Sequence, residues 1–368
     1  MFIPVNEPKL DGNELKYVTD CITTGWISSE GPYVKKFEDE FAKTVHRTHA
    51  IAVSNGSVAL DAAIAALGIT TGDEVIMPTF TIISCAAAIV RAGAKPVLVD
   101  ADPLTFNMDV SQIEAKITPK TKAIMVVHIY GLPVEMDIVL DLAKKYNLKI
   151  IEDAAEVHGQ TYKGRPCGSF GDISTFSFYP NKHITTGEGG MIVCNDDALA
   201  QKCRSLRNLC FKPERRFVHD ELGWNFRITN VQAAIGLAQL EGFDKAIEQK
   251  RLVGETYNRC LEEVAGIQLP LADTNYAENI YWVYTIVLKN SQTAETLIKA
   301  LKEKGIGSRP FFYGMHNQPV FKKMGLFKNE QYPVADFISK HGFYIPSGLS
   351  LKKNQQFVVV EALKKSLK

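Results

Sequence analysis

The chain has 368 residues, of which 46% are hydrophobic and 23% charged, and its formal net charge is +1. This length exceeds what one small hydrophobic core needs, so we expect two domains. The balanced charge gives no indication of a nucleic acid or a membrane surface as partner, and no apolar run approaches the ~18 residues that would span a membrane.

Short apolar runs alternate with helical patterns between residues 50 and 194. The spacing of apolar residues predicts helices at Ser57–Leu67, Ile82–Arg91, Ser111–Ile117 and Val134–Tyr146. We expect strands at Ala50–Val53, Glu74–Met77, Pro96–Val99, Ala123–Val127, Lys149–Glu152, Ile173–Phe178 and Met191–Cys194. Because these strands are rich in Val and Ile and barely alternate, they predict an α/β fold with a mostly parallel central sheet flanked by helices. Ligands of such sheets bind beyond the carboxyl ends of the strands.

The pattern changes near residue 242. A helix of small apolar residues is expected at Thr229–Leu240, followed by a charged amphipathic helix at Phe243–Glu263. The remainder predicts a strand at Tyr281–Leu288 and helices at Ala294–Lys304 and Phe357–Lys365, with several prolines between them. We therefore divide the chain into a large α/β domain, residues 1–242, and a smaller C-terminal α+β domain, residues 243–368.

The N-terminus and the cysteines indicate where the protein resides. Residues 1–8 contain neither the basic segment nor the apolar core of a signal peptide. The seven cysteines are scattered, without the spacing of a metal site. We expect a reduced, cytoplasmic protein with no bound metal.

One lysine has an unusual context in the segment from Ser177 to Gly190. Lys182 lies between an apolar strand that ends in aromatic residues and a Thr-Thr-Gly-Glu-Gly-Gly turn. A solvated surface lysine is the ordinary explanation of any lysine, but so much aromatic bulk and so many glycines are rare in surface loops. Asp153 follows a second apolar strand. A lysine that forms a Schiff base and a carboxylate for the ring nitrogen are the two groups that pyridoxal phosphate (PLP) requires of a protein.

Three further residues have both a functional and a structural interpretation. In Ser54-Asn55-Gly56-Ser57, a strand end, a glycine and a helix start suit a phosphate, but Ser57 can simply cap the helix. Asp153 can likewise cap a helix at 154–157, instead of keeping a pyridine nitrogen protonated. His183 resembles a catalytic base, but it adjoins Lys182 and we interpret it as structural.

Several motifs in fixed order resemble one enzyme family. They are Ser-Asn-Gly-Ser at 54–57, Glu-Asp-Ala-Ala-Glu at 152–156, the lysine motif at 177–190 and Asn-Phe-Arg-Ile-Thr-Asn at 225–230. Together with the segments 25–29 and 308–313 they resemble the nucleotide-sugar aminotransferases among the fold-type I PLP enzymes, over nearly the whole chain. Within that family the lysine motif is similar to the subgroup that acts on GDP-4-keto-6-deoxy-D-mannose.

The resemblance implies a role for each matched residue. Lys182 would form the Schiff base with PLP, Asp153 would bind the pyridinium nitrogen, and Glu156 would lie near the phenolic oxygen. Gly56, Ser57 and Ser177 would hold the phosphate, and Asn225 would reach it from the second subunit of a homodimer, which can assemble further. Residues towards the sugar nucleotide would be Trp26, Ser28, Tyr313 and His316.

Two positions depart from the family pattern. Ile82 stands where an aromatic ring usually stacks on the cofactor, so the stacking contribution of ~0.5–1.5 kcal/mol would be absent. Gly314 stands where proline usually follows the Arg-Pro-Phe-Phe-Tyr segment. Both positions bear on which sugar is preferred.

The resemblance implies a ping-pong transamination for O-antigen biosynthesis in lipopolysaccharide. L-Glutamate would convert PLP to pyridoxamine phosphate (PMP), which then aminates C4 of the keto sugar, with Lys182 as general acid and base. Alternatives are a UDP- or dTDP-4-keto-6-deoxyglucose (viosamine type) or a 3-keto sugar as substrate. A sugar 3-dehydratase, which has histidine in place of the lysine, and a non-enzymatic sensor are further alternatives.

Overall fold

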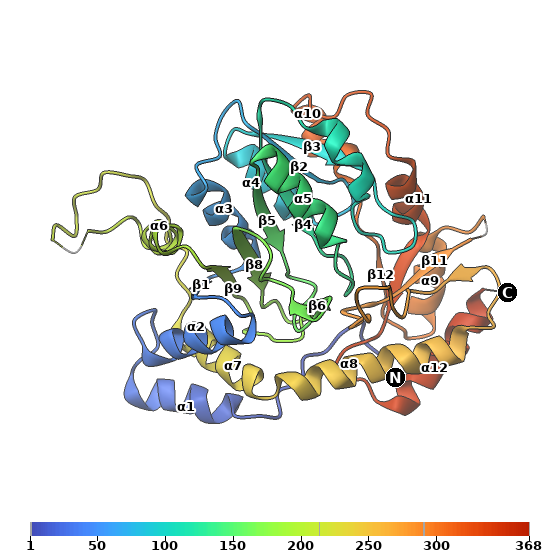
Figure 1. Ribbon diagram of the computed structural model, residues 1–368. Helices are drawn as coiled ribbons and strands as arrows, with labels where there is room; N and C mark the ends of the chain where they lie inside the picture. Colours follow the sequence, from blue (N-terminus) through green and yellow to red (C-terminus); the bar gives the residue numbers. More distant parts are fainter. Residues whose placement is uncertain (1, 213, 290, 368) are drawn as a thin grey trace.

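The computed structural model describes residues 2–212, 214–289 and 291–367. Its centre is a seven-stranded sheet in the order β1-β9-β8-β5-β4-β2-β3 (Figure 1). The strands are β1 (His49–Val53), β2 (Glu74–Pro78), β3 (Lys95–Val99), β4 (Thr121–Val127), β5 (Lys149–Asp153), β8 (Ile173–Ser177) and β9 (Gly190–Cys194). Neighbours from β3 to β8 run parallel, whereas β9 is antiparallel to both β8 and β1. The prediction of a mostly parallel sheet is confirmed.

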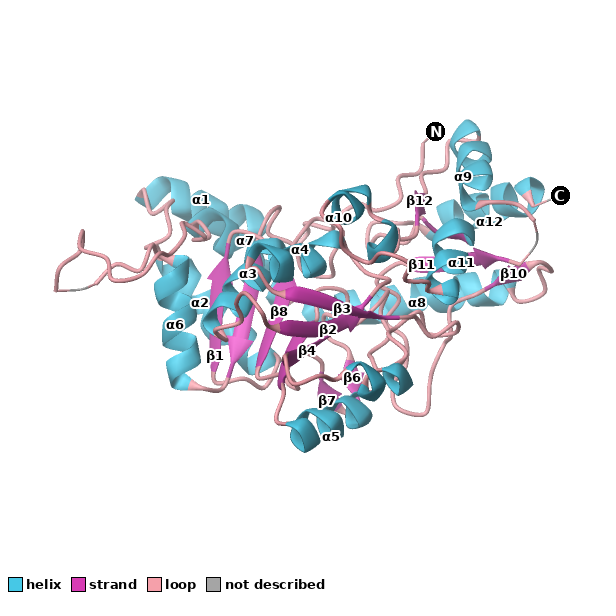
Figure 2. Ribbon diagram, turned by 90° about the horizontal axis from the view of Figure 1, so that it is seen from above, coloured by secondary structure: helices cyan, strands magenta, loops and turns pink. Residues whose placement is uncertain are grey.

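Both faces of this sheet are buried, which explains why its strands barely alternate. Ile51 and Val53 pack among α3 (Gly56–Ala66), α4 (Ile83–Arg91) and α6 (Asp197–Arg207), while their neighbours Ala50 and Ala52 pack among α2 (Pro32–Thr44) and α7 (Asn230–Glu241). Helix α5 (Met136–Tyr146) covers the part of that second face formed by β2, β4 and β5. Helix α1 (Glu14–Thr24) packs on α7. Figure 2 shows the strands with helices on either side.

A second, smaller sheet has its own core. It is antiparallel, in the order β10 (Ile267–Gln268), β11 (Tyr284–Leu288), β13 (Gly342–Ile345) and β12 (Arg309–Pro310). Around it lie α9 (Ala294–Glu303), α11 (Pro333–His341) and α12 (Lys353–Ser366), whereas α10 (Pro319–Lys323) packs through Phe321 in the core of the large sheet. Helix α8 (Phe243–Leu261) runs from the large sheet to this smaller one (Figure 1). The N-terminal segment joins the smaller core through Ile3, which pairs with Ile306. The division of the chain after residue 242 therefore stays a proposal.

One predicted helix is wrong, and the helix considered only as an alternative at 154–157 does not form either. Residues 111–117 form two short 3₁₀ turns, η1 (Val110–Gln112) and η2 (Glu114–Lys116), because Ile117 is already extended and one or two turns are too short to propagate an α-helix. The alternative helix at 154–157 is a turn. A short hairpin, β6 (Thr161–Tyr162) and β7 (Arg165–Pro166), follows it. Among the described residues, no helix is long and apolar enough to cross a membrane.

Candidate active site

The carboxyl ends of β1 and β8 flank the first residue of β9, because both strands pair with β9. Gly190 is opposite Val53, the last residue of β1, and also opposite Ser177, the last residue of β8. A side chain at position 190 has no room, since its Cβ would lie 2.6 Å from the carbonyl carbon of Asn55. The segments that follow β1 and β8 therefore leave the sheet together, and a cavity of about 710 Å³ opens beside them and the end of β5.

This cavity brings together the residues that the sequence assigned to the cofactor within one chain. Seven of them line it: Gly56, Ser57, Ile82, Asp153, Glu156, Ser177 and Lys182. They come from the starts of α3 and α4, the end of β5 and the turn after it, and the end of β8 with its turn. The cavity lies beyond the carboxyl ends of parallel strands, where ligands of such sheets bind.

Lys182 is held by the turn that follows β8. Its backbone N–H donates to the carbonyl oxygen of Tyr179 at 2.9 Å, and its Nζ lies 3.6 Å from the ring centroid of Trp282. Burial lowers the pKa of the Lys182 amine, while Glu156 and Asp153 act in the opposite direction. A lysine amine with a lowered pKa is neutral more often at neutral pH, and only a neutral amine attacks a carbonyl or accepts a proton.

Asp153 is fixed at the end of β5 and is only 3% exposed. Its Oδ1 accepts the N–H of Ala155 at 3.1 Å, and its Oδ2 accepts the thiol hydrogen of Cys85 at 3.3 Å. Burial raises the pKa of Asp153, opposed by these two donors and by Lys182. A buried carboxylate that can still accept a hydrogen bond stabilises a protonated ring nitrogen, because a nearby negative charge favours the positively charged form of that nitrogen.

The start of α3 forms an anion-binding corner. Asn55 caps this helix by accepting the N–H of Val58, so the interpretation of Ser57 as the cap is wrong. Within the described part of the chain, the N–H groups of Gly56 and Ser57 have no hydrogen-bond partner. A Cβ at Gly56 would lie 2.7 Å from that of Ser177, which brings the Ser177 hydroxyl against the corner. Free amides at a helix start and nearby hydroxyls suit a phosphate.

Glu156 is a buried carboxyl on the cavity wall. Its Oε2 accepts the backbone N–H of Tyr130 at 2.9 Å, and the side chain is 5% exposed. Burial raises its pKa to about 8, although Lys182 and the Tyr130 amide oppose the shift. At neutral pH Glu156 is mostly protonated and can donate a hydrogen bond to an oxygen in the cavity.

Two buried polar atoms on the wall also fit a polar ligand. The Thr175 hydroxyl and the Asn181 side-chain oxygen have no hydrogen-bond partner among the described residues, and both residues line the cavity. Buried polar groups are seldom left unpaired in native proteins, so these atoms indicate a bound group. A phosphate corner, an acid and an amine in one cavity fit PLP.

The predicted substrate residues do not line this cavity. Trp26 and Tyr313 are exposed. Asn225, which is predicted to reach the phosphate of the second subunit, is also exposed and forms a β-bridge with Asn208. The carbonyl oxygen of Ser28 accepts the N–H of Asn230. His316 is buried, with Nδ1 2.7 Å from the Thr79 hydroxyl and Nε2 3.0 Å from Asp336. The roles of these residues stay predictions.

An aromatic wall was missed by the sequence reasoning. Trp282, Phe312 and Tyr344 also line the cavity, and Tyr130 stacks on both Trp282 and Phe312. Trp282 belongs to the apolar run that was predicted as a strand from 281, whereas β11 begins at Tyr284. An apolar run in a sequence is typical of a buried core strand. No local feature of the sequence distinguishes a ring that faces a cavity, such as that of Trp282, from rings that pack in the core.

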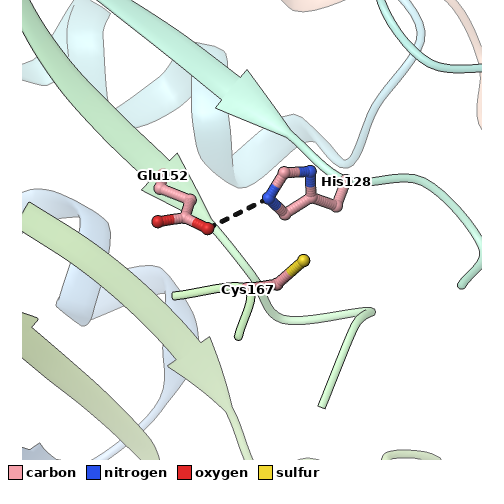
Figure 3. Close-up of side chains that lie close together, drawn as sticks. All are labelled: His128, Glu152 and Cys167. Atoms are coloured by element: carbon pink, nitrogen blue, oxygen red, sulfur yellow. Dashed lines mark hydrogen bonds and ion pairs between the residues drawn. The ribbon is translucent and has the colours of Figure 1, made fainter. Parts of the chain in front are cut away.

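His128, Glu152 and Cys167 form a buried cluster at the carboxyl ends of β4 and β5 (Figure 3). His128 Nδ1 accepts the N–H of Val134, so the proton is on Nε2, which donates to Glu152 at 3.1 Å. Glu152 also accepts the backbone N–H groups of Gly168, Phe170 and Gly171 and the Ser174 hydroxyl. Burial raises the pKa of the Cys167 thiol, which keeps it protonated. The imidazole of His128 and the carboxylate of Glu152 are committed to hydrogen bonds, and Glu152 anchors residues 168–171.

Comparison with known proteins identifies the family. Residues 8–364 match the DegT/DnrJ/EryC1/StrS aminotransferase family. The chain belongs to this family. It is therefore an aminotransferase, and PLP is its cofactor. His183 is buried and does not line the cavity, and its structural role stays a prediction.

Individual relatives cover almost the whole chain. It is 44% identical over 362 residues to a GDP-perosamine synthase of Escherichia coli O157:H7, with 98% of each chain covered. It is 44% identical over 363 residues to a GDP-perosamine synthase of Caulobacter vibrioides, with 98% of this chain and 97% of the relative covered. An aminotransferase structure from Psychrobacter cryohalolentis superposes with a TM-score of 0.92 at 29% identity, covering 100% of this chain and 99% of the other.

Proposed function

We propose that this aminotransferase transfers the amino group of L-glutamate to C4 of GDP-4-keto-6-deoxy-D-mannose and forms GDP-perosamine in the cytoplasm, for surface polysaccharide such as O-antigen. Two relatives with that printed name, each 44% identical over nearly the full length, support the choice of sugar. The reaction class rests on one observation. The amine of Lys182 and the carboxyl of Asp153 line the same cavity as the helix-start amides of Gly56 and Ser57.

The residues of the chain divide the work. PLP, when bound, supplies the carbonyl carbon that exchanges amines and the ring that delocalises an electron pair. Asp153 would keep the ring nitrogen protonated, and Gly56, Ser57 and Ser177 would hold the phosphate. Glu156 would donate a hydrogen bond to the phenolic oxygen.

Lys182 would take the proton from the α-carbon of glutamate and return a proton to the sugar carbon in the second half-reaction. The amine is suited to both tasks because its lowered pKa lies nearer to the working pH than that of a free lysine. The aromatic wall of Trp282, Phe312 and Tyr344 would exclude water from the reacting atoms and pack against the apolar face of a deoxy sugar.

The two departures from the family pattern affect the sugar side more than the chemistry. Ile82 lines the cavity and is 42% exposed, so it can pack on the cofactor ring without stacking. Gly314 lies against His316, where a Cβ would be 2.7 Å from Cε1 of the imidazole. The residue at 314 therefore stays small while His316 keeps its bonds to Thr79 and Asp336.

We infer that the working unit is a homodimer. The segment between α6 and α7, described at 208–212 and 214–229, projects from the body of the chain (Figure 1). It carries Phe217 and Leu222, which are 81% and 93% exposed, and Asn225 lies at its base. Large apolar side chains at such exposure favour burial in a partner. In a dimer Asn225 would complete the anion corner of the second subunit.

A panel of nucleotide sugars tests the proposal. The purified protein is supplied with PLP and glutamate, together with the GDP-, UDP- or dTDP-linked 4-keto-6-deoxy sugar. We expect 2-oxoglutarate and GDP-perosamine from the GDP-mannose-derived ketone, and no product with Lys182→Ala. Turnover of only the UDP or dTDP sugar would select the viosamine-type alternative, and amination of only a 3-keto isomer, supplied as a further substrate, would select the 3-keto alternative. No amino transfer from glutamate to any of these sugars would contradict the choice of substrate and donor.

A further inference from the structure

The indole ring of Trp282 lies directly against the amine of Lys182. The distance from Lys182 Nζ to the ring centroid is 3.6 Å, well inside the ≈6 Å range of a cation–π contact. Trp282 is 4% exposed, and its ring lines the cavity. An amine this close to a buried indole has its position set by that ring.

Three contacts hold Trp282 in place, two to its indole ring and one to its backbone carbonyl oxygen. Its Nε1–H donates to the carbonyl oxygen of Asn181 at 2.8 Å, so the same ring that contacts Lys182 also fixes the residue before it. The Trp282 carbonyl oxygen accepts a hydrogen bond from Lys250 Nζ at 2.8 Å, and the same Nζ donates to the Ser347 carbonyl oxygen. Tyr130 stacks on the indole with an interplanar angle of 26°.

Lys250 is an unusual source of such a restraint. It comes from the middle of α8, is 2% exposed, and bonds two carbonyl oxygens that precede β11 and follow β13. The long helix thereby connects the smaller sheet to the lysine turn through Trp282. A buried ammonium is expensive to retain unless its hydrogen bonds do something that an apolar side chain cannot.

We propose that Trp282 is the positioning residue of Lys182: its ring holds the free ε-amine at the cavity wall between proton transfers, and its N–H fixes the turn that carries the lysine. This deepens the proposed function and rests on the assignment of Lys182 to proton transfer. The neutral amine takes up one proton, becomes an ammonium group over the indole, and gives one proton back. No oxidant or co-reactant is needed for this cycle. Among side chains, an indole gives the strongest cation–π contact, so it stabilises the protonated amine without contributing charge.

Other groups near the amine titrate as well and must be separated from it. Those that interact electrostatically with Lys182 are Glu156, Asp153, Cys85, His158 and His183. Burial lowers the pKa of both histidines, that of His158 to about 3, so they are neutral at pH 7. Burial also lowers the pKa of Lys250 to about 7. A titration observed at Trp282 is therefore assigned to Lys182 only by a lysine variant.

Tryptophan fluorescence gives a readout that does not depend on turnover. The chain has three tryptophans, so Trp26→Phe with Trp224→Phe leaves Trp282 as the sole indole. In the full-length, cofactor-free chain we expect its emission to change between pH 6 and 11 as the amine loses its proton. Lys182→Met in the same background should remove that transition, while Lys250→Met should leave it. An unchanged transition in the Lys182→Met chain would overturn the proposal.

Variants of Trp282 test how its ring affects the rate of transamination in the PLP-bound enzyme. Leucine at 282 removes both the ring and the N–H, whereas phenylalanine keeps a weaker ring. We expect Trp282→Leu to slow the half-reaction with glutamate about 5- to 30-fold with little change in KM, and Trp282→Phe to fall between it and the unchanged protein. Equal rates for all three proteins, or equal losses for Leu and Phe, would contradict the role of the ring.

The two tests separate this inference from the proposed function. If the protein fails to transaminate any sugar, the proposed function fails, but the fluorescence of Trp282 still reports whether its ring contacts the amine. If transamination is normal and the transition is independent of Lys182, the inference alone fails. A urea midpoint for each variant excludes unfolding as the reason for a lost signal.

Discussion

Individual residues in the cavity have protonation states that their burial decides. Glu156 and Lys182 line the same cavity, and burial shifts the pKa of each in the direction that favours its neutral form. Burial thus favours a hydrogen-bond donor at Glu156 and a proton acceptor at Lys182.

Glu156 should therefore make the stability of the cofactor-free protein depend on pH. Its folded-state pKa of about 8 is above the usual 4.5, so the folded state binds the proton more tightly. The stabilisation is complete below pH 4.5 and is lost as the pH rises through 8. Glu156→Gln removes this pH-dependent contribution to the free energy of unfolding, which is on the order of 2–4 kcal/mol. Urea unfolding at pH 5 and pH 8 should show a smaller decrease in the variant, and parallel decreases would contradict the protonation of Glu156.

At the scale of elements, the carboxylate of Glu152 connects β5 to the loop at 167–171. Burial raises its pKa, but hydrogen bonds from His128 and from the Gly168 and Gly171 amides outweigh burial and bring the pKa to about 2. A lowered carboxyl pKa gives stability that is present above pH 4.5 and lost as the pH falls through 2. Glu152 precedes Asp153, so the same strand end carries an anchor on one face and a cavity residue on the other.

We expect Glu152→Gln to destabilise the fold by about 3–5 kcal/mol. An amide cannot accept all five hydrogen bonds that Glu152 receives, and its own N–H₂ group would face other donors. The five donors belong to His128, Gly168, Phe170, Gly171 and Ser174. The free energy of unfolding in urea at pH 7 measures the loss. Glu263→Gln, at an exposed position, is the matched control and should change it by less than about 0.5 kcal/mol. Equal values for both variants would show that the anchor contributes nothing.

Gly190 allows a further prediction, which concerns the close contact between β9 and the start of α3. A methyl group there would collide with the backbone of Asn55 and Gly56, at 2.6 and 2.9 Å, and push α3 away from Ser177. Gly190→Ala should weaken PLP binding and reduce stability by about 1–3 kcal/mol. Gly12→Ala, whose Cβ would meet nothing closer than 3.4 Å, serves as the control. PLP affinity measured by absorbance titration should fall only for the first variant, and unchanged affinity would contradict the proposed corner.

Much of this element arrangement could be predicted from the sequence. The strand runs and the motifs at Gly56, Asp153 and Lys182 lie on strand ends, where local composition and periodicity carry the signal. The rest could not be predicted, since Trp282 and Lys250 come from segments more than 60 residues after Lys182 and reach the site only through tertiary packing. The expected helix at 111–117 failed because periodicity does not encode how soon the chain must turn into β4.

At the scale of the whole molecule, we propose that a second subunit completes the cavity of one chain. Gly56, Ser57 and Ser177 supply amides and hydroxyls but no cation, and Arg91, which lines the same cavity, is already paired with Asp61. Asn225 lies outside this cavity, at the base of the projecting segment. If the segment of one subunit reaches the cavity of the other, Asn225 adds an amide donor to the anion corner there.

Subunit mixing tests this shared site. Lys182→Ala and Asn225→Ala should each be nearly inactive as pure dimers, because each lacks one part of every site. When the two variants are unfolded together and refolded, half of the dimers are mixed on a random basis, and each mixed dimer contains one site with both native residues. Activity should therefore rise to about a quarter of that of the unchanged protein, while separately refolded and then combined dimers stay inactive until they exchange subunits. Sedimentation at several concentrations establishes that the dimers form, and an Asn225→Ala protein that is fully active on its own would show that the site is complete within one chain.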